Sequence, residues 1–267
     1  IELHDYFEND LSKYDKWKHN ILYGSLLLIY NKEKYNRICP LYGGFNNYIM
    51  QSAFNMRHLL ELIHQSFVNA EKSNYTLEGI DINNIVIDIK IQSESAKVVS
   101  AREFDRKIAY LGKHGTSLKR IAERLGKIFA IIQENPAQSF SEVNQFTIEY
   151  NDSIPSKESE LINILLNELT MWSVLIEKNN TKIISKTENN ALKEYRIHPI
   201  LSAYFGISPR KKRKQEFKIN EIRTIFIGSD DDYGKLHSEY AKIKKTSDDN
   251  TKVDKEVNSS KQNTEYK

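Results

Sequence analysis

The sequence predicts a mostly helical α+β fold. Apolar residues recur at three- and four-residue steps in several stretches between residues 11 and 172, which is the period of an amphipathic helix. Short β-prone runs appear only later, between residues 145 and 198. Hydrophobic residues make up 39% of the 267 residues, which is enough for a core and allows one or two domains.

The first 70 residues predict two helices. Residues 11–30 carry aromatic and aliphatic side chains on one side. A break follows at residues 36–46, which contain Pro40 and the pair Gly43-Gly44. The clearest helix comes next, with its apolar residues at Ile49, Ala53, Met56, Leu60, Ile63 and Phe67. This spacing predicts one amphipathic helix of about five turns.

The middle of the chain contains one open segment and one helical pair. Residues 71–92 fit two structures: Ile85, Ile87, Ile89 and Ile91 alternate as in a strand, whereas Ile82, Ile85, Ile89 and Ala96 suit a helix. From Ser93 onward we expect helix. Residues 103–111 and 117–133 then predict two helices on either side of the Gly112–Gly115 turn, and the second has a continuous apolar face.

The C-terminal half predicts a mixed unit. Residues 145–150 alternate like a short strand, and a helix with Ser156 as a plausible N-cap follows. Its apolar face is expected at Leu161, Leu165, Leu169 and Trp172. Two β-prone runs, 181–185 and 194–198, are joined by a polar turn. A helix, two strands joined by a charged loop and then a basic segment is the order of a winged helix.

Five consecutive cations are the most informative motif. They are Arg210, Lys211, Lys212, Arg213 and Lys214. They directly follow the apolar, aromatic stretch 197–209, which Pro199 and Pro209 stiffen. A basic block fixed to a buried segment presents its charges from a defined surface and suits polyphosphate contact. The alternative is a solvated positive loop. Because net charge is only +3, clustering rather than composition carries this signal.

Other chemistry finds little support in the sequence. Cys39 is the one cysteine, so no intramolecular disulfide forms and a reducing, cytoplasmic location is expected. No apolar run has the length of a membrane span, and no G-x-x-x-x-G-K-[ST] phosphate loop is present. Glu61 and His64 share a helix face, but a second such pair is absent, so we expect no metal site. The chain begins with Ile1, which suggests a fragment that lacks an N-terminal part.

Several stretches resemble one protein family. They are residues 39–62, 112–126, 141–148, and the region from Trp172 through the Pro199-to-Lys214 block. In their order and spacing they resemble bacterial AAA+ ATPases of the origin-recognition-complex (ORC/CDC) type, over residues 15–240. The resemblance implies an AAA+ lid-type helix bundle at 1–100 and a winged-helix domain at 101–228. A helical extension at 229–245 and a disordered tail at 246–267 complete the expected organisation.

The resemblance also assigns roles to two residues. By match of motif, Arg57 is the sensor-2 arginine that faces bound nucleotide, and Asn55 shapes the start of its helix. This sequence departs from the pattern at Phe54, where glycine is common. The alternative for Arg57 is a surface arginine paired with Glu61 one turn on. ATP and Mg²⁺ are implied for the full-length family. We expect no cofactor and no ATP hydrolysis in this chain, because it lacks the phosphate loop.

The expected partner is duplex DNA. The five cations would contact phosphates, with Lys182 and Lys186 of the wing loop adding to them. About four neutralised phosphates would give a log–log salt slope of about −3.6. Homo-oligomers would form through the ATPase core that this chain lacks, and no membrane contact is expected. The alternative function is a helical protein-interaction module of an oligomeric assembly, whose binding would depend weakly on salt.

Overall fold

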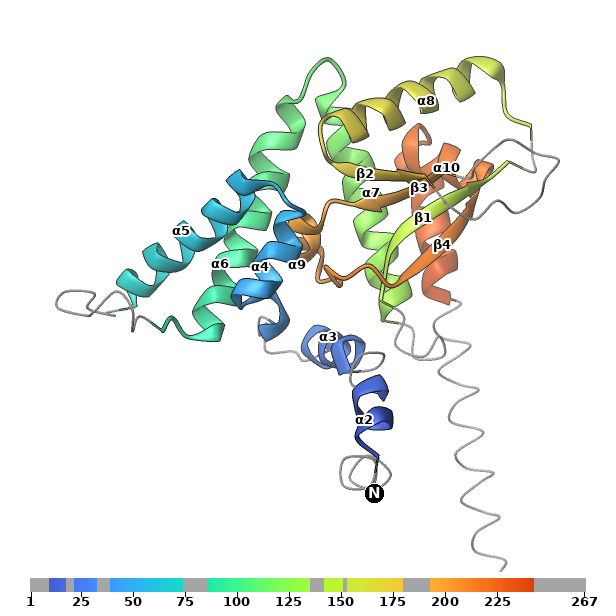
Figure 1. The fold of residues 1–267 in the computed structure, drawn as a ribbon. Helices are drawn as coiled ribbons and strands as arrows, with labels where there is room; N and C mark the ends of the chain where they lie inside the picture. The colour runs from blue at the N-terminus through green and yellow to red at the C-terminus, as the bar shows by residue number, and fades with distance from the viewer. Residues whose placement is uncertain are drawn as a thin grey trace, which may run out of the picture.

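A computed structural model shows the fold (Figure 1). The structure describes residues 10–17, 22–32, 39–73, 86–134, 142–150, 153–179 and 193–242. They form a helical bundle joined to a four-stranded mixed sheet, so the mostly helical α+β prediction is confirmed. This arrangement is compatible with a helical lid followed by a winged helix. The predicted strand 181–185, Lys182, Lys186 and the expected tail 246–267 lie outside the described residues.

The sheet has the strand order β2-β3-β1-β4. Strands β2 (Leu175–Asn179) and β3 (Lys193–Ile197) form an antiparallel pair, and β3 is also antiparallel to β1 (Val143–Glu149). Strand β4 (Arg213–Lys218) runs parallel to β1 and forms one edge. The described order is α8, β2, β3 and the basic segment, and β2 lies at residues that the sequence analysis did not predict as a strand.

The two faces of the sheet differ in chemistry. Because side chains alternate along a strand, Phe146 shares one face with Tyr195, which lies opposite it, and with Phe217 of β4. The rings of Phe146 and Phe217 lie 5.6 Å apart, and Phe129 of α7 (Gly115–Gln133) packs against both. Helices α7 and α10 (Ile219–Phe226) contact β1 on this apolar side. The opposite face carries a polar row of Gln145, Arg196 and Lys214.

The helical bundle precedes the sheet in the chain. Helices α2 (Leu11–Trp17) and α3 (Tyr23–Lys32) occupy the range expected to form one helix, and residues 18–21 between them are not described. Helix α6 (Ile89–Arg102) packs against α5 (Met56–Lys72), which also contacts α4 (Phe45–Ser52). Asp88 caps α6 by accepting a hydrogen bond from the Lys90 backbone, so helix starts four residues before Ser93.

The helix predicted across residues 49–67 is interrupted. Ala53 and Phe54 have φ values of +46° and +67°, in the left-handed region, and α5 begins after them. Two consecutive left-handed residues cannot continue a right-handed helix. The single-helix prediction is therefore wrong: α4 and α5 are separate helices joined by a tight turn.

Helix α6 leads directly into an irregular helical stretch. A π-helix, Glu103–Lys107, and a 3₁₀ turn, Ile108–Tyr110, replace the regular helix expected at 103–111. The wide π turn brings the neighbouring residues Glu103 and Phe104 into the interior together. Helix α7 then follows, and its predicted apolar face is buried: Leu118, Ile121, Leu125, Ile128 and Ile132.

One continuous hydrophobic core joins the bundle and the sheet. It includes Tyr48 and Leu62 of the bundle together with Phe146 and Phe217 of the sheet. The stretch 199–209 links them, because α9 (Ser202–Phe205) packs on α6. Gly126 of α7 makes room for Phe205, whose ring would lie 2.5 Å from an added Cβ. The domain boundary expected between residues 100 and 101 lies inside α6.

Helix α8 (Ser156–Met171) differs from its prediction in two details. Pro155 rather than Ser156 occupies the N-cap position, and it makes no side-chain cap. Leu161 and Trp172 were expected in the core, yet they are 39% and 41% exposed. The buried face consists instead of Ile162, Leu165, Leu166 and Leu169. The apolar stripe is therefore rotated on the helix relative to the predicted one.

Arg124 of α7 ties the last described helix to the rest of the fold. Its buried guanidinium donates to the backbone carbonyls of Thr224, Ile225 and Gly228 at 3.0–3.1 Å. It also pairs with Asp230 at 2.7 Å. These carbonyls lie at the C-terminal end of α10, and Asp230 is the first residue of a helix described over 230–242. This helix lies within the extension expected at 229–245. One side chain thus joins the end of one helix to the start of the next.

Candidate functional site: a lid arginine and an anchored basic segment

The start of α5 carries the two residues that the family resemblance singled out. The Asn55 side chain accepts a hydrogen bond from the Arg57 backbone N–H at 3.0 Å, which satisfies one of the free donors of the first turn. Asn55 is therefore the N-cap of α5. Phe54 precedes it with a left-handed backbone, which explains why glycine suits this position.

Arg57 lies over two carboxylates. Its guanidinium is 3.8 Å from Glu61, one turn along α5, and 3.7 Å from Glu103 of the π-helix. The side chain remains 61% exposed. The structure thus contains the Glu61 pair that was the alternative for this arginine, and it adds Glu103. Both separations exceed the 2.7–2.9 Å of a strong charge-assisted hydrogen bond, so Arg57 is held loosely.

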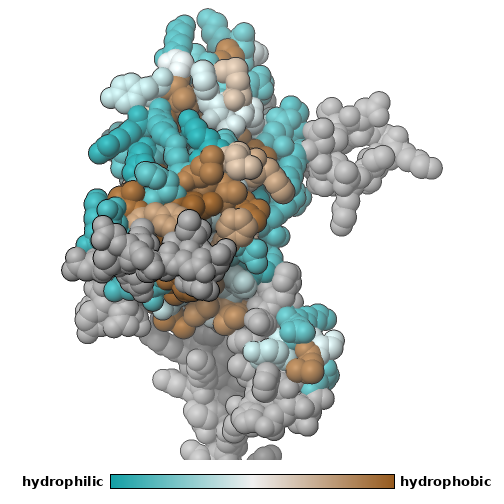
Figure 2. All heavy atoms as spheres, turned by 60° about the vertical axis from the view of Figure 1, so that its left-hand side comes forward, coloured by the Kyte–Doolittle hydropathy of each residue, from teal (hydrophilic) through white to brown (hydrophobic). Residues whose placement is uncertain are grey.

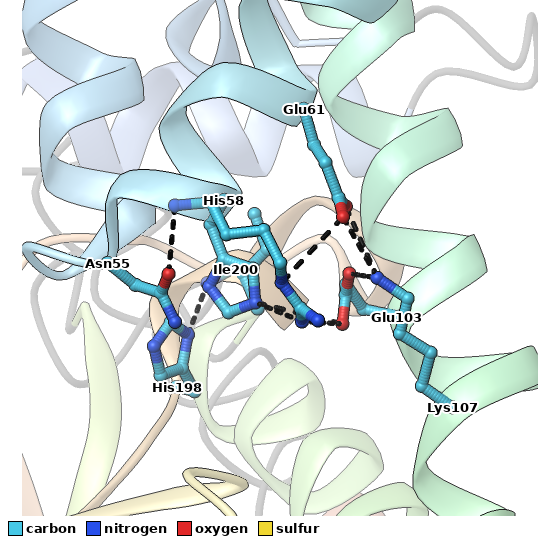
Figure 3. A network of polar contacts seen from close by, with 8 residues as sticks. Asn55, His58, Glu61, Glu103, Lys107, His198 and Ile200 are labelled. Atoms are coloured by element: carbon cyan, nitrogen blue, oxygen red, sulfur yellow. Dashed lines mark hydrogen bonds and ion pairs between the residues drawn. The ribbon is translucent and has the colours of Figure 1, made fainter.

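Lys107 holds the same two carboxylates more tightly. Its ammonium is 3.1 Å from Glu61 and also donates to Glu103, as Figure 3 shows. Burial alone would raise the pKa of Glu103, but hydrogen bonds from His58 and Lys107 outweigh it and lower the pKa to about 2. Glu103 is therefore a buried anion at neutral pH. Lys107 keeps it compensated whether or not Arg57 stays in place.

Two histidines connect this cluster to the C-terminal half. The His58 ring, buried beside Glu103, lies 5.0 Å from the His198 ring in an edge-on contact. His198 Nδ1 accepts a hydrogen bond from the Ile200 backbone N–H at 3.2 Å and so caps the 3₁₀ turn Pro199–Leu201. Burial, with the charges of His58 and Arg196, lowers the pKa of His198 to about 3, so its ring is neutral. Figure 3 shows His198 beside Asn55, on the side of the cluster away from Glu103.

The segment that leads to the five cations is anchored by buried polar groups. Asn144 of β1 donates to the carbonyls of Ser208 and Arg210 at 2.6 and 2.8 Å. The Ser208 hydroxyl donates to Glu142 at 2.5 Å, and the Ser208 backbone N–H donates to Gln133 Oε1 at 2.9 Å. The chain therefore leaves the core at a fixed position. This rigidity is what the prolines in the sequence predicted.

Arg210 differs from the expectation for the block. It is 8% exposed, its guanidinium lies 3.4 Å from Glu142, and its plane lies 3.9 Å from the centre of the Tyr23 ring. A buried cation pairs with a buried anion because either one alone would cost several kcal/mol. The prediction that all five cations are presented at the surface is therefore wrong for Arg210, whose charge is used inside the fold.

The remaining four cations are less buried. Lys211 lies 3.1 Å from Glu194 of β3, and Lys212 is partly covered. Burial and the nearby Arg210 charge lower the pKa of Lys212, while Glu142 partly opposes them. Arg213 and Lys214 are exposed on the edge strand β4, where successive side chains point to opposite faces. The wing-loop candidates Lys182 and Lys186 lie outside the described residues.

Sequence reasoning missed four residues that organise the site: Glu103, Lys107, Glu142 and Asn144. Glu142 and Asn144 lie in the family-like stretch 141–148, which gave neither residue a role. Among the described residues, no group of three or more histidines, cysteines or acids is arranged to hold a metal ion. In that same part of the chain, no helix has the length and apolar character needed to cross a bilayer.

Comparison with known proteins places this arrangement in a family. No curated protein and no solved structure matches the chain. A family description, ORC-CDC6-like, matches residues 2–217, from the first residues of the chain into β4. The match therefore includes the capped Asn55–Arg57 helix start, the π-helix and the anchored basic segment. The chain belongs to the ORC-CDC6-like family, whose members are related to the origin-recognition AAA+ ATPases.

Proposed function

We propose that this chain is the lid and DNA-binding portion of an origin-recognition-like AAA+ ATPase, and that it binds duplex DNA through its basic segment. The observation that carries the proposal is the anchoring of residues 208–210 by Asn144 and Glu142. Cations on a rigid segment lose less conformational entropy on binding than cations in a floppy tail. They can therefore contact successive phosphates at low cost.

The contact surface is narrower than the sequence alone suggests. Arg210 is buried against Glu142, and Lys211 lies against Glu194. Lys212 is partly exposed, Arg213 and Lys214 are exposed, and this exposure makes these three residues the main phosphate contacts. Three contacts give a log–log salt slope of about −2.7, shallower than the −3.6 expected from four. Lys182 and Lys186 would steepen it if the wing loop reaches the backbone of the DNA.

Binding should be nearly indifferent to DNA sequence. Helix α8 directly precedes the β2–β3 pair, which is the chain position of the recognition helix in a winged helix. Its charged residues are one lysine and three glutamates: Lys157, Glu158, Glu160 and Glu168. Leu161 and Ile164 are exposed on its outer face. An acidic and apolar surface does not suit a groove lined by phosphates. The phosphates therefore supply the affinity.

Arg57 supports the nucleotide-sensing part of the proposal. Its contacts with Glu61 and Glu103 are long, and Lys107 compensates both carboxylates independently. Arg57 can therefore turn toward a phosphate without leaving a buried charge uncompensated. The chain contains no phosphate loop, so Arg57 would act on nucleotide held by an ATPase core outside this sequence.

The test is duplex-DNA binding measured by fluorescence anisotropy between 50 and 200 mM salt. We expect Lys212→Ala/Arg213→Ala/Lys214→Ala to lose most of the salt slope while keeping its fold. The matched control is Lys72→Ala/Lys90→Ala/Lys113→Ala, which removes three exposed charges from the bundle and the turn before α7. Because both variants lose the same net charge, only a local contact distinguishes them. Equal slopes in the two variants would contradict the proposal.

A further inference from the structure

The outer face of α5 is an apolar seam that the described structure leaves open. Met56, Leu60 and Phe67 are 64%, 58% and 37% exposed, and the half-buried Ile63 lies between them in the same row. Their spacing of four, three and four residues is the a/d pattern of a coiled coil. Figure 2, which brings the left-hand side of Figure 1 forward, shows hydrophobic side chains gathered on it.

A small pocket lies at one end of this seam. It has a volume of about 160 Å³, and its lining consists of the apolar residues Phe45, Ile63, Phe67 and Ile87 together with Tyr48, Ser66 and Gln92. An apolar cavity of about 150 Å³ can hold a benzene ring. Phe45 is itself 61% exposed at the rim. The pocket therefore has the size and lining for one aromatic side chain.

A projecting aromatic side chain lies at the other end. Phe54 is 96% exposed, at the turn between α4 and α5, on a left-handed backbone that disfavours a side chain. A strained position that holds a large, fully exposed ring costs stability and suggests a use for the ring. The surface thus carries both an aromatic knob and an aromatic-sized pocket.

The positions of knob and pocket follow a symmetry. Leu60 lies six residues after Phe54 and six before Ser66, which lines the pocket. In sequence, Leu60 is therefore midway between the knob and one wall of the pocket. A two-fold axis near Leu60 would place Phe54 of each copy over the pocket of the other. We propose that a second copy of this chain covers this face, with the two α5 helices antiparallel.

The proposed contact is large enough for a specific dimer. The exposed parts of Phe45, Ile49, Phe54, Met56, Leu60 and Phe67 amount to about 600 Å² per copy, taking about 200 Å² for a whole aromatic side chain. Two copies would bury about 1,200 Å², the lower limit for a specific interface. Antiparallel α5 helices also align their dipoles favourably. This dimer is independent of the proposed DNA binding, which uses β4 on another part of the molecule.

A symmetric disulfide tests the position of the axis. A residue on a two-fold axis meets its own copy, so Leu60→Cys should give covalent dimers under oxidised glutathione. The native cysteine, Cys39, is buried and does not compete. Met171→Cys on α8 is the control, because it is 65% exposed and lies outside the seam. Equal cross-linking of the two variants, or none with Leu60→Cys, would overturn the proposal.

A second measurement tests the knob. We expect sedimentation to show dimers, and Phe54→Ala to weaken self-association by at least about tenfold, as loss of a central aromatic anchor does. Circular dichroism should show an unchanged fold, because Phe54 buries almost nothing within one copy. A monomer at all concentrations would show that another occupant, such as an ATPase core, covers the seam. Undiminished association of Phe54→Ala would refute the knob-and-pocket arrangement.

Discussion

Replacing Phe54 by glycine should stabilise a single copy of this protein. The φ of +67° costs a residue with a side chain about 1–2 kcal/mol, whereas glycine adopts it freely. Glycine loses about 0.5–1 kcal/mol more backbone entropy on folding than alanine does. Because Phe54 is 96% exposed, removing its ring forfeits almost no burial. The net expectation is a gain of about 0.5–1 kcal/mol in the free energy of unfolding.

Urea unfolding at low protein concentration measures this gain without any contribution from pairing between copies. The midpoint should rise with an unchanged slope, and the melting temperature should increase by about 1–4 °C. Phe54→Ala is the matched control, because it removes the ring but keeps the Cβ, so its midpoint should stay close to that of the parent. A loss of stability in Phe54→Gly would refute the argument, since it would mean that the ring is packed or that the turn is not left-handed.

Two further predictions concern buried charge. Arg124→Lys should lower the free energy of unfolding, measured in urea, by about 3 kcal/mol, because the carbonyls of Thr224, Ile225 and Gly228 lose their shared donor. The control is Arg120→Lys at an exposed position, which should change the free energy of unfolding by less than about 0.5 kcal/mol. Stability should fall as pH drops from 6.5 to 4.5, by up to about 2 kcal/mol, because the unfolded chain protonates His198 at its ordinary pKa of 6.5 while the folded pKa is about 3. His198→Asn keeps a cap for the Ile200 N–H and should flatten that interval; an equally steep pH profile would exclude His198 as the cause. Below pH 4.5 both proteins should weaken further, since Glu103 has a folded pKa of about 2 and loses its stabilising charge there.

The sequence predicted the helices whose apolar faces meet the core, but not every face that is covered. The spacing in α7 correctly identified Leu118 through Ile132 as buried. The same kind of spacing gives α5 an apolar stripe that includes Met56 and Leu60, yet both residues are exposed. Periodicity reports that a helix has an apolar stripe. Whether another element covers that stripe depends on contacts distant in the sequence.

The parts that sequence reasoning missed depend on such distant contacts. Strand β4 is polar except at Phe217, and it forms because β1, about 70 residues earlier, offers a parallel edge. Arg210 is buried because it pairs with Glu142, which directly precedes β1. No local sequence pattern predicts this pairing. By contrast, the capped start of α5 was readable, since Asn55 and Arg57 lie within one turn and the family motif spans them.

Helix α6 has a mechanical consequence. It packs on α5 at one side and on α9 at the other, and the hydroxyl of Ser100 near its end accepts a hydrogen bond from the Tyr204 backbone at 2.9 Å. One helix therefore contacts both the element that carries Arg57 and the stretch that leads to the basic segment. A displacement of α5 would reach the basic segment through this shared helix.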